Sequence, residues 1–198
     1  RSMTRSEAAA IFARLLAEKN GDTISTAANT KFADIPAHAW YSGYVKYLSN
    51  NGITYGKSKT IFAPNDAITR AEFTTMAVRF FDVYGDGDAE IMEQFSGFND
   101  VSSGYWAAEY IKYAALHGWI NGYGDGSFHA DREINRAEVV TIVNRLLDRE
   151  ADEDYIADNL RKLNTFPDVT KRHWAYYAVM EAANAHTAVL GESESWSK

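Results

Sequence analysis

The chain has 198 residues, of which 46% are hydrophobic, 14% aromatic and 24% charged, and this composition excludes collagen-like, low-complexity and largely disordered proteins. The absence of cysteine excludes disulfide scaffolds, thiolate zinc sites and thiol nucleophiles. The formal net charge of -7 argues against a nucleic-acid partner, because nucleic-acid binders normally carry a basic surface.

The sequence shows neither a membrane helix nor a leader segment. No apolar run approaches the ~20 residues that a membrane helix needs, so we expect no membrane insertion. No signal peptide is visible at the start, and the opening Arg1-Ser2-Met3 is typical of a cut end. We therefore expect a fragment of a longer protein.

The first predicted helix starts at residue 4, at a motif that occurs three times. Thr or Asn followed three residues later by Glu is a capping box, in which each side chain satisfies a free backbone N–H group. The arginines of the three copies are 65 and 66 residues apart, and apolar residues at helical spacing follow each copy, which predicts three amphipathic helices. The copies are Thr4-Arg5-Ser6-Glu7, Thr69-Arg70-Ala71-Glu72 and Asn135-Arg136-Ala137-Glu138.

A second motif, Phe-x-Asp with a Trp eight residues after the Phe, opens what we call the front half of each repeat. From each Trp, apolar residues recur at i+4, i+5 and i+8, which predicts a helix with the Trp on its apolar stripe. The copies, with a period of 66 and then 68 residues, are Phe32-Ala33-Asp34 with Trp40, Phe98-Asn99-Asp100 with Trp106, and Phe166-Pro167-Asp168 with Trp174.

Glycine-rich segments follow the first two front-half helices. The clearest contains Gly122, Tyr123, Asp125 and Gly126, and it predicts tight turns in which glycine supplies positive φ. The earlier segment, Gly56-Lys57-Ser58-Lys59, lacks this pattern, and we expect its lysines to be solvated, with added positive charge for a ligand as the alternative. Polar links connect the repeats at 17–31, 82–97 and 148–165.

These elements predict a mainly α fold of helix–loop–helix repeats. Residues 32–97 and 98–165 are complete repeats with their linkers. Residues 1–31 hold only the arginine-motif helix, which is the back half of a repeat, and its linker. Residues 166–198 hold only a front half. We hypothesise that residues 4–16 complete this C-terminal half-repeat. The result would be a monomer in which six main helices surround a pseudo-threefold axis.

The motif set resembles the S-layer homology domain. Phe-x-Asp-Val, Trp-Ala, Gly-Tyr-x-Asp-Gly-x-Phe and Ile-Thr-Arg-Ala-Glu carry the resemblance, which extends from Thr4 to Ala183 and is most complete from Phe98 to Glu138. The resemblance implies three tandem repeats in a secreted protein of the bacterial cell surface or S-layer. It also implies binding to an acidic secondary cell-wall polysaccharide, often one with pyruvate ketals on N-acetylmannosamine.

The arginine of the helix-start motif needs an explanation of its own. A cation in the first helical turn opposes the helix dipole by roughly 0.3–1 kcal/mol when it is exposed, and capping does not require it. An ion pair with a nearby carboxylate, such as the Asp of Phe-x-Asp, is one explanation. The other, which we favour, is a bidentate clamp on a ligand carboxylate beside free N–H groups. We expect working sites at the loops that precede Arg70 and Arg136, with Arg5 as a weaker third.

Three further groups of residues are candidates for glycan contact. We expect the aspartates of Phe-x-Asp to fix a turn by accepting bonds from backbone N–H groups, with sugar contact as the alternative. We expect the tryptophans in the core, with stacking on a sugar face as the alternative. The glycine-rich loop is the candidate for contacts with sugar hydroxyl groups. The whole ligand set is Arg5, Arg70, Arg136, Asp34, Asp100, Asp168, Trp40, Trp106, Trp174, Gly122, Tyr123, Asp125 and Gly126.

Other functional classes have weaker support. Residues 82–93 match an EF-hand loop except at its third position, Tyr84, so we expect an acidic solvated turn, with bound calcium as the alternative. No Gly-x-Ser-x-Gly elbow, phosphate-binding glycine loop or metal-ligand histidine spacing is present, so we expect neither an enzyme nor a cofactor. The alternative function is a protein–protein or S-layer self-assembly module without direct glycan binding.

Overall fold

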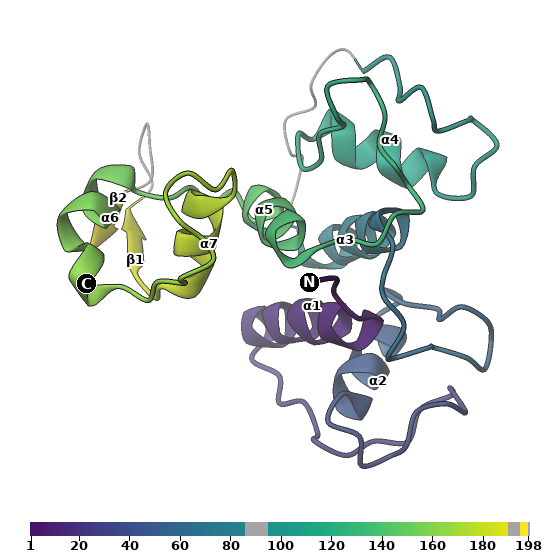
Figure 1. The fold of residues 1–198 in the computed structure, drawn as a ribbon. Coiled ribbons are helices and arrows are strands. Elements are labelled where there is room, and N and C mark those ends of the chain that lie inside the picture. Colours follow the sequence, from purple (N-terminus) through teal and green to yellow (C-terminus); the bar gives the residue numbers. More distant parts are fainter. Residues whose placement is uncertain (86–94, 190–194, 198) are drawn as a thin grey trace. The chain divides into compact units, whose positions relative to one another are not determined.

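The computed structural model describes residues 1–85, 95–189 and 195–197. The chain divides into two compact units, Arg1–Ile134 and Asn135–Lys198. The described residues are mainly helical, as predicted, with one two-stranded sheet (Figure 1). Each described helix is too short or too polar to cross a lipid bilayer. Most of the candidate calcium loop, residues 86–93, lies outside the described residues.

The described residues of the first unit form four helices. They are α1 (Arg5–Asn20), α2 (Ser42–Asn50), α3 (Arg70–Tyr84) and α4 (Ala108–Leu116). The predicted capping boxes are present at the starts of α1 and α3, where Thr4 and Thr69 accept the N–H groups of Glu7 and Glu72 and each glutamate accepts the N–H of its threonine. Both predicted helix starts are therefore confirmed to the residue.

The helices that begin at the repeated arginine, here called Arg-led helices, pack on the front-half helices that follow them in the chain. In the first unit α1 contacts α2, α3 contacts α4, and α1 and α3 also contact each other. The ring of Phe12 lies 5.2 Å from that of Phe73 and 5.0 Å from that of Phe80, so these three fully buried residues form the centre of the α1–α3 contact. A helix pair thus joins the end of one sequence repeat to the start of the next.

Two backbone bridges bring each glycine-rich loop to a helix start. Thr4 pairs with Ala67, and Thr69 pairs with Glu133. The Arg5 N–H group also donates to the Asp66 carbonyl oxygen, and the Arg70 N–H group donates to that of Arg132. The segment 52–68, here called loop 1, is therefore held against the start of α1. The segment 118–134, called loop 2, is held against the start of α3.

The second unit has a smaller core of its own. It contains α5 (Arg136–Leu146), α6 (Glu153–Asn159), the 3-10 helix η1 (Leu160–Lys162), α7 (Tyr176–Ala183) and an antiparallel pair of strands, β1 (Thr187–Val189) and β2 (Ser195–Ser197). A capping box at Asn135 and Glu138 begins α5, which packs on α7. The core of this unit is formed by the buried residues Ile156, Tyr176, Met180 and Trp196, the last of which lies in β2. The sequence analysis did not predict the two strands.

The prediction that the repeated tryptophans lie in the core is wrong. Trp40, Trp106 and Trp174 are 55%, 57% and 65% exposed. Each lies two residues before the helix begins, in a turn, so the residue after it is the one that faces the core. The later stripe positions of the first two front halves, Val45 and Leu48 and then Ile111 and Ala114, are buried as predicted, so the error concerns the Trp that precedes the helix.

Candidate functional site

Arg5 and Arg70 hold equivalent places and are 4% and 5% exposed. The Nε atom of Arg5 donates to the Phe62 carbonyl oxygen, and that of Arg70 donates to the Phe128 carbonyl oxygen, both at 2.8 Å. Each guanidinium also lies over the ring of the same phenylalanine, 5.0 and 4.4 Å from its centroid. Loop 1 therefore belongs to Arg5 and loop 2 to Arg70. We had expected each loop to serve the arginine that follows it in sequence, and that assignment is shifted by one repeat.

The ion-pair explanation holds for Arg5. Its Nη1 atom lies 3.0 Å from Oε1 of Glu72, the capping-box glutamate of α3, and both side chains are largely buried. A carboxylate at this distance offsets the unfavourable position of the cation in the first turn of α1. The partner is not the Asp of the Phe-x-Asp motif, which the sequence had suggested.

Asp34 and Asp100 accept hydrogen bonds from backbone N–H groups, as predicted, but these groups belong to the glycine-rich loop of the same repeat and not to the local turn. Asp34 accepts from Phe62 (2.9 Å) and Ala63 (2.6 Å), and Asp100 accepts from Phe128 and His129, both at 2.7 Å. Burial would raise the pKa of Asp100, but these two amides and the charge of His129 lower it below its usual value. Each aspartate therefore closes its front half onto the end of its loop.

Gly56 and Gly122 are required by the same closure. A Cβ atom on either glycine would lie 2.4 Å from a ring carbon of the motif phenylalanine, Phe32 or Phe98. Both loops also contain a backbone N–H group that donates to the carbonyl oxygen four residues later, from Lys57 to Ile61 and from Tyr123 to Ser127, both at 2.8 Å. The candidate residue Gly122 thus has a structural role in letting the loop approach the core.

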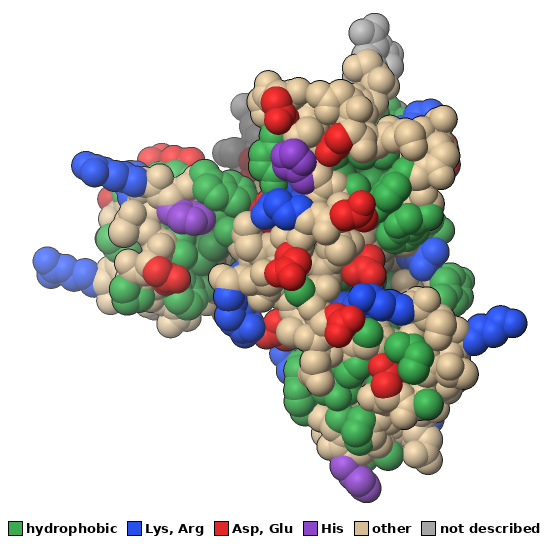
Figure 2. Space-filling view, turned by 45° about the vertical axis from the view of Figure 1, so that its right-hand side comes forward, with side chains coloured by type: hydrophobic (Ala, Val, Ile, Leu, Met, Phe, Trp, Pro, Cys, Tyr) green, Lys and Arg blue, Asp and Glu red, His purple; other side chains and the backbone are tan. Residues whose placement is uncertain are grey.

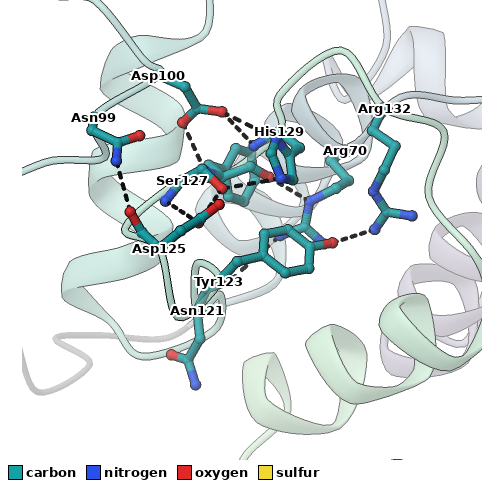
Figure 3. Close-up of polar contacts among 10 residues, drawn as sticks. Arg70, Asn99, Asp100, Asn121, Tyr123, Asp125, Ser127, His129 and Arg132 are labelled. Carbon is teal, nitrogen blue, oxygen red and sulfur yellow. Dashed lines mark hydrogen bonds and ion pairs between the residues drawn. The ribbon is translucent and has the colours of Figure 1, made fainter.

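Loop 2 presents an exposed run, residues 121–126, beside Arg70 (Figure 3). The Tyr123 ring is 38% exposed, lies 5.2 Å from the Arg70 guanidinium carbon and receives a hydrogen bond on its hydroxyl from Arg132. The Asp125 carboxylate accepts from the Ser127 hydroxyl (2.6 Å) and amide (2.9 Å), and these bonds lower the pKa of Asp125. The structure thus brings the predicted loop residues together around one arginine.

Tyr105 fixes the Trp106 turn to the same loop. Its hydroxyl donates to Asp131 at 2.6 Å, and burial together with this carboxylate raises the pKa of Tyr105 to about 12. The tyrosine is therefore a neutral donor under all ordinary conditions. Ala39 stands at the equivalent place beside Trp40, so loop 1 lacks this connection.

The predicted residues of the second unit have a different setting. Arg136 is the first residue of α5, and its side chain is exposed, as are those of Asp168 and Trp174. Strands β1 and β2 follow α7 where the earlier repeats have a glycine-rich loop. Among the described residues of the second unit, the third set of candidate residues therefore has no loop of the same kind beside it.

The sequence model of the S-layer homology domain matches residues 31–74 and 97–140. Each matched segment runs from a Phe-x-Asp motif into an Arg-led helix, so two repeats are confirmed and the third stays a prediction. Both matched repeats contribute their Phe-x-Asp motif and their loop to the two arginine-centred sites of the first unit.

Several bacterial surface proteins are similar to the chain. It is 32% identical, over 98% of its length, to cell surface glycoprotein 1 of Acetivibrio thermocellus and covers 8% of that protein. It is 30% identical, over 97% of its length, to the cellulosome-anchoring protein of the same organism and covers 41% of it. It is 31% identical, over 75% of its length, to the surface-layer 125 kDa protein of Lysinibacillus sphaericus and covers 12% of it. The chain thus spans less than half of each relative.

The family match and these relatives support a secreted, cell-surface or cell-wall location. They also support a surface-anchoring module. Figure 2 shows one face, on which Lys and Arg side chains are interspersed with Asp and Glu among the described residues. On this face, recognition of an acidic ligand would therefore depend on local groups and not on a broad basic surface.

Sequence reasoning missed four residues that shape loop 2. His129, Ser127, Arg132 and Asn99 all bind within it, and Asn99 donates to the Asp125 carbonyl oxygen at 2.8 Å. Aligning the two loops at the repeat offset would have found three of them. At these places loop 1 has Ala63, Ile61 and Asp66, which have different chemistry on the same backbone.

Proposed function

We propose that this chain is a non-catalytic anchoring module that binds an acidic, pyruvylated secondary cell-wall polysaccharide. The observation that carries the proposal is loop 2, where an exposed tyrosine ring and exposed backbone are fixed beside the cations Arg70 and Arg132. A tyrosine face suits the apolar face of a sugar, and a guanidinium suits the ketal carboxylate. Tyr123, Asp125, Gly122, Gly126 and Trp106 are the residues proposed to contact the sugar there.

The three helix-start arginines divide into two roles in this proposal. Arg5 and Arg70 are buried against their loops, and Arg5 is bound to Glu72, so both act mainly by positioning the loops. Arg136 has an exposed side chain at a helix start, and we propose it as a direct contact of the ligand carboxylate. Asp34, Asp100 and Asp168 support the loops or turns, and Trp40 and Trp174 are proposed as further stacking platforms.

Binding of purified wall polysaccharide tests the proposal. The polysaccharide, stripped of protein, should bind the chain, and removal of its ketal carboxylates should weaken binding at least about tenfold, as expected for a lost charge-assisted bidentate bond. Arg136→Ala should reduce binding with little effect on the melting temperature. Arg161→Ala, at another exposed arginine of the second unit, is the matched control. Retention on intact walls but not on the stripped polysaccharide would favour the protein–protein alternative.

We also propose that residues 4–16 complete the C-terminal half-repeat 166–198, giving a monomeric particle of six main helices about a pseudo-threefold axis. Three equivalent helix pairs, α1–α2, α3–α4 and α5–α7, support the threefold repetition of one helix pair that this arrangement requires. Small-angle X-ray scattering tests it, because two independent units joined by a hinge give a larger radius of gyration than one closed particle. Sedimentation equilibrium would show whether the chain is a monomer.

A further inference from the structure

Loops 1 and 2 have the same backbone at one unusual position. Ala63 and His129 are both left-handed, with φ of 60° and 55°, although neither is glycine. Their N–H groups are held by the equivalent aspartates, Asp34 and Asp100. The repeat thus places two different side chains, a methyl group and an imidazole, at one point of the same scaffold.

The imidazole of His129 lies between two acidic groups. Its Nδ1 atom is 3.5 Å from Oδ2 of Asp100, and its Nε2 atom is 3.1 Å from Oγ of Ser127. The Ser127 hydroxyl in turn lies 2.6 Å from Oδ1 of Asp125. A protonated imidazole has two N–H donors, one for Asp100 and one for Ser127, and Ser127 then donates to Asp125. The neutral imidazole can donate to only one of them, so proton uptake completes this series of hydrogen bonds.

The same ring also faces the exposed surface of the proposed site. The side chain of His129 is 47% exposed, and its ring centroid is 4.8 Å from that of Tyr123 (Figure 3). Charged groups that contact Tyr123 include Arg70 from α3 and Arg132 from the loop itself, 5.2 and 5.7 Å from the ring centroid. A proton on His129 therefore adds to the positive charge that Arg70 and Arg132 bring to this tyrosine.

We propose that His129 is a specificity-determining residue of loop 2, and that its proton makes this site bind an acidic saccharide more tightly in mildly acidic solution. Histidine is the side chain that ordinarily gains its charge between pH 5 and 8. A ligand carboxylate remains ionised at pH 5.5, because free carboxyl groups ordinarily titrate near pH 4. Loop 1 has Ala63 at the equivalent place, so it lacks this proton-dependent charge.

The size of the effect follows from the exposure of the ring. An added unit charge at the solvated edge of a site, partly screened by salt, is expected to strengthen binding of a monoanionic saccharide about three- to tenfold between pH 7.5 and pH 5.5. By linkage, bound saccharide must move the midpoint of the His129 titration to higher pH by the corresponding amount. A neutral saccharide should show neither effect.

This inference rests on the proposed function, and calorimetric titration of a pyruvylated saccharide into the whole chain tests it. The affinity of the chain should rise from pH 7.5 to pH 5.5, and the dependence should disappear in His129→Ala, which reproduces Ala63 of loop 1. His129→Ala should fold, because alanine already occupies this backbone conformation at residue 63. NMR titration of the His129 ring, with and without saccharide, gives an independent reading of the linkage.

Three results would overturn the inference. Equal affinity at both pH values, or a pH dependence that persists in His129→Ala, rejects the role of His129 and leaves the anchoring function intact. Absence of saccharide binding at every pH rejects the proposed function together with it. The inference is supported only if binding, its pH dependence and the shift of the His129 resonance all occur together.

Discussion

Loops 1 and 2 of the first unit share a scaffold and differ in the surface that it presents. In both, a helix-start arginine donates to a phenylalanine carbonyl oxygen, and an aspartate accepts two consecutive backbone N–H groups. On the surface, loop 1 has a Lys57–Asp66 ion pair at 3.0 Å, where loop 2 has Tyr123 bonded to Arg132. The exchange replaces a paired lysine by an aromatic ring with a cation on its hydroxyl.

This comparison separates two kinds of repeated residue. The residues that are the same in both loops are buried or bound to backbone, so their repetition reflects construction of the fold. Some of the residues that differ, such as Lys57 and Tyr123 or Asp66 and Arg132, are exposed, so they are available to determine ligand specificity. Repetition of a residue in this chain is therefore stronger support for a structural role than for ligand contact.

Removal of Arg5 should have the largest effect on stability. Arg5→Ala leaves the Glu72 carboxylate beside α1 without this partner and removes the bond to Phe62, so the free energy of unfolding should fall by about 3–5 kcal/mol. Urea denaturation of the chain measures this. Arg14→Ala is the control on the same helix, because Arg14 is exposed and binds only Tyr44 among the contacts described for it, and it should cost less than about 1 kcal/mol.

The two aspartates should come next and should have matched effects if the loops share one scaffold. Asp34→Ala and Asp100→Ala each remove two acceptor bonds to backbone amides, so each should destabilise the chain by about 2–3 kcal/mol. Amide hydrogen exchange should accelerate at residues 62 and 63 in the first variant and at residues 128 and 129 in the second. Loss of protection in only one loop would show that the scaffold is not equivalent.

Acid should weaken loop 2 through Asp100 and Asp125. The pKa of each is lowered in the folded chain, so each contributes stability above the pH at which free carboxyl groups titrate, near pH 4. That contribution disappears as the pH falls through the lower folded value. The melting temperature of the chain should therefore fall more steeply below pH 4 than that of Asp100→Asn, which cannot titrate at this position. Parallel curves would contradict the prediction.

The sequence predicts helix starts well because capping is local. Thr4, Thr69 and Asn135 each bind a residue three positions later, and these contacts need no information about the rest of the fold. The residues that bind the loops could not be predicted from local sequence, because Asp100 and Phe128 lie 28 residues apart and Arg70 and Phe128 lie 58 apart. Nothing in the pattern showed that a loop closes on the previous Arg-led helix and not on the following one.

The sequence identified many residues of the candidate site but did not predict the role of each side chain. Arg5, Arg70, Asp34 and Asp100 were identified from repetition, yet their side chains are directed into the fold. The exposed tryptophans were assigned to the core because a turn residue and a helix residue are indistinguishable by apolar spacing alone. His129 carried no repeated signal, since its counterpart in loop 1 is alanine.

The exposed tryptophans offer the smallest effect on stability and a direct test of how the repeats differ in function. Trp40→Ala and Trp106→Ala should change the free energy of unfolding by less than about 0.5 kcal/mol, because more than half of each side chain is exposed. If each indole stacks on a sugar, each variant should weaken polysaccharide binding about three- to tenfold, the equivalent of one aromatic contact. Surface plasmon resonance on immobilised polysaccharide measures this.

Trp174→Ala sharpens the test, because Trp174 is as exposed but is followed by β1 and β2 in place of a glycine-rich loop. Its loss should have a smaller effect on binding than that of Trp106, whose turn is fixed to loop 2 by the Tyr105–Asp131 bond. Three equal losses would mean that the tryptophans act independently of the loops. The exposed ring alone, and not the loop beside it, would then define where the polysaccharide binds.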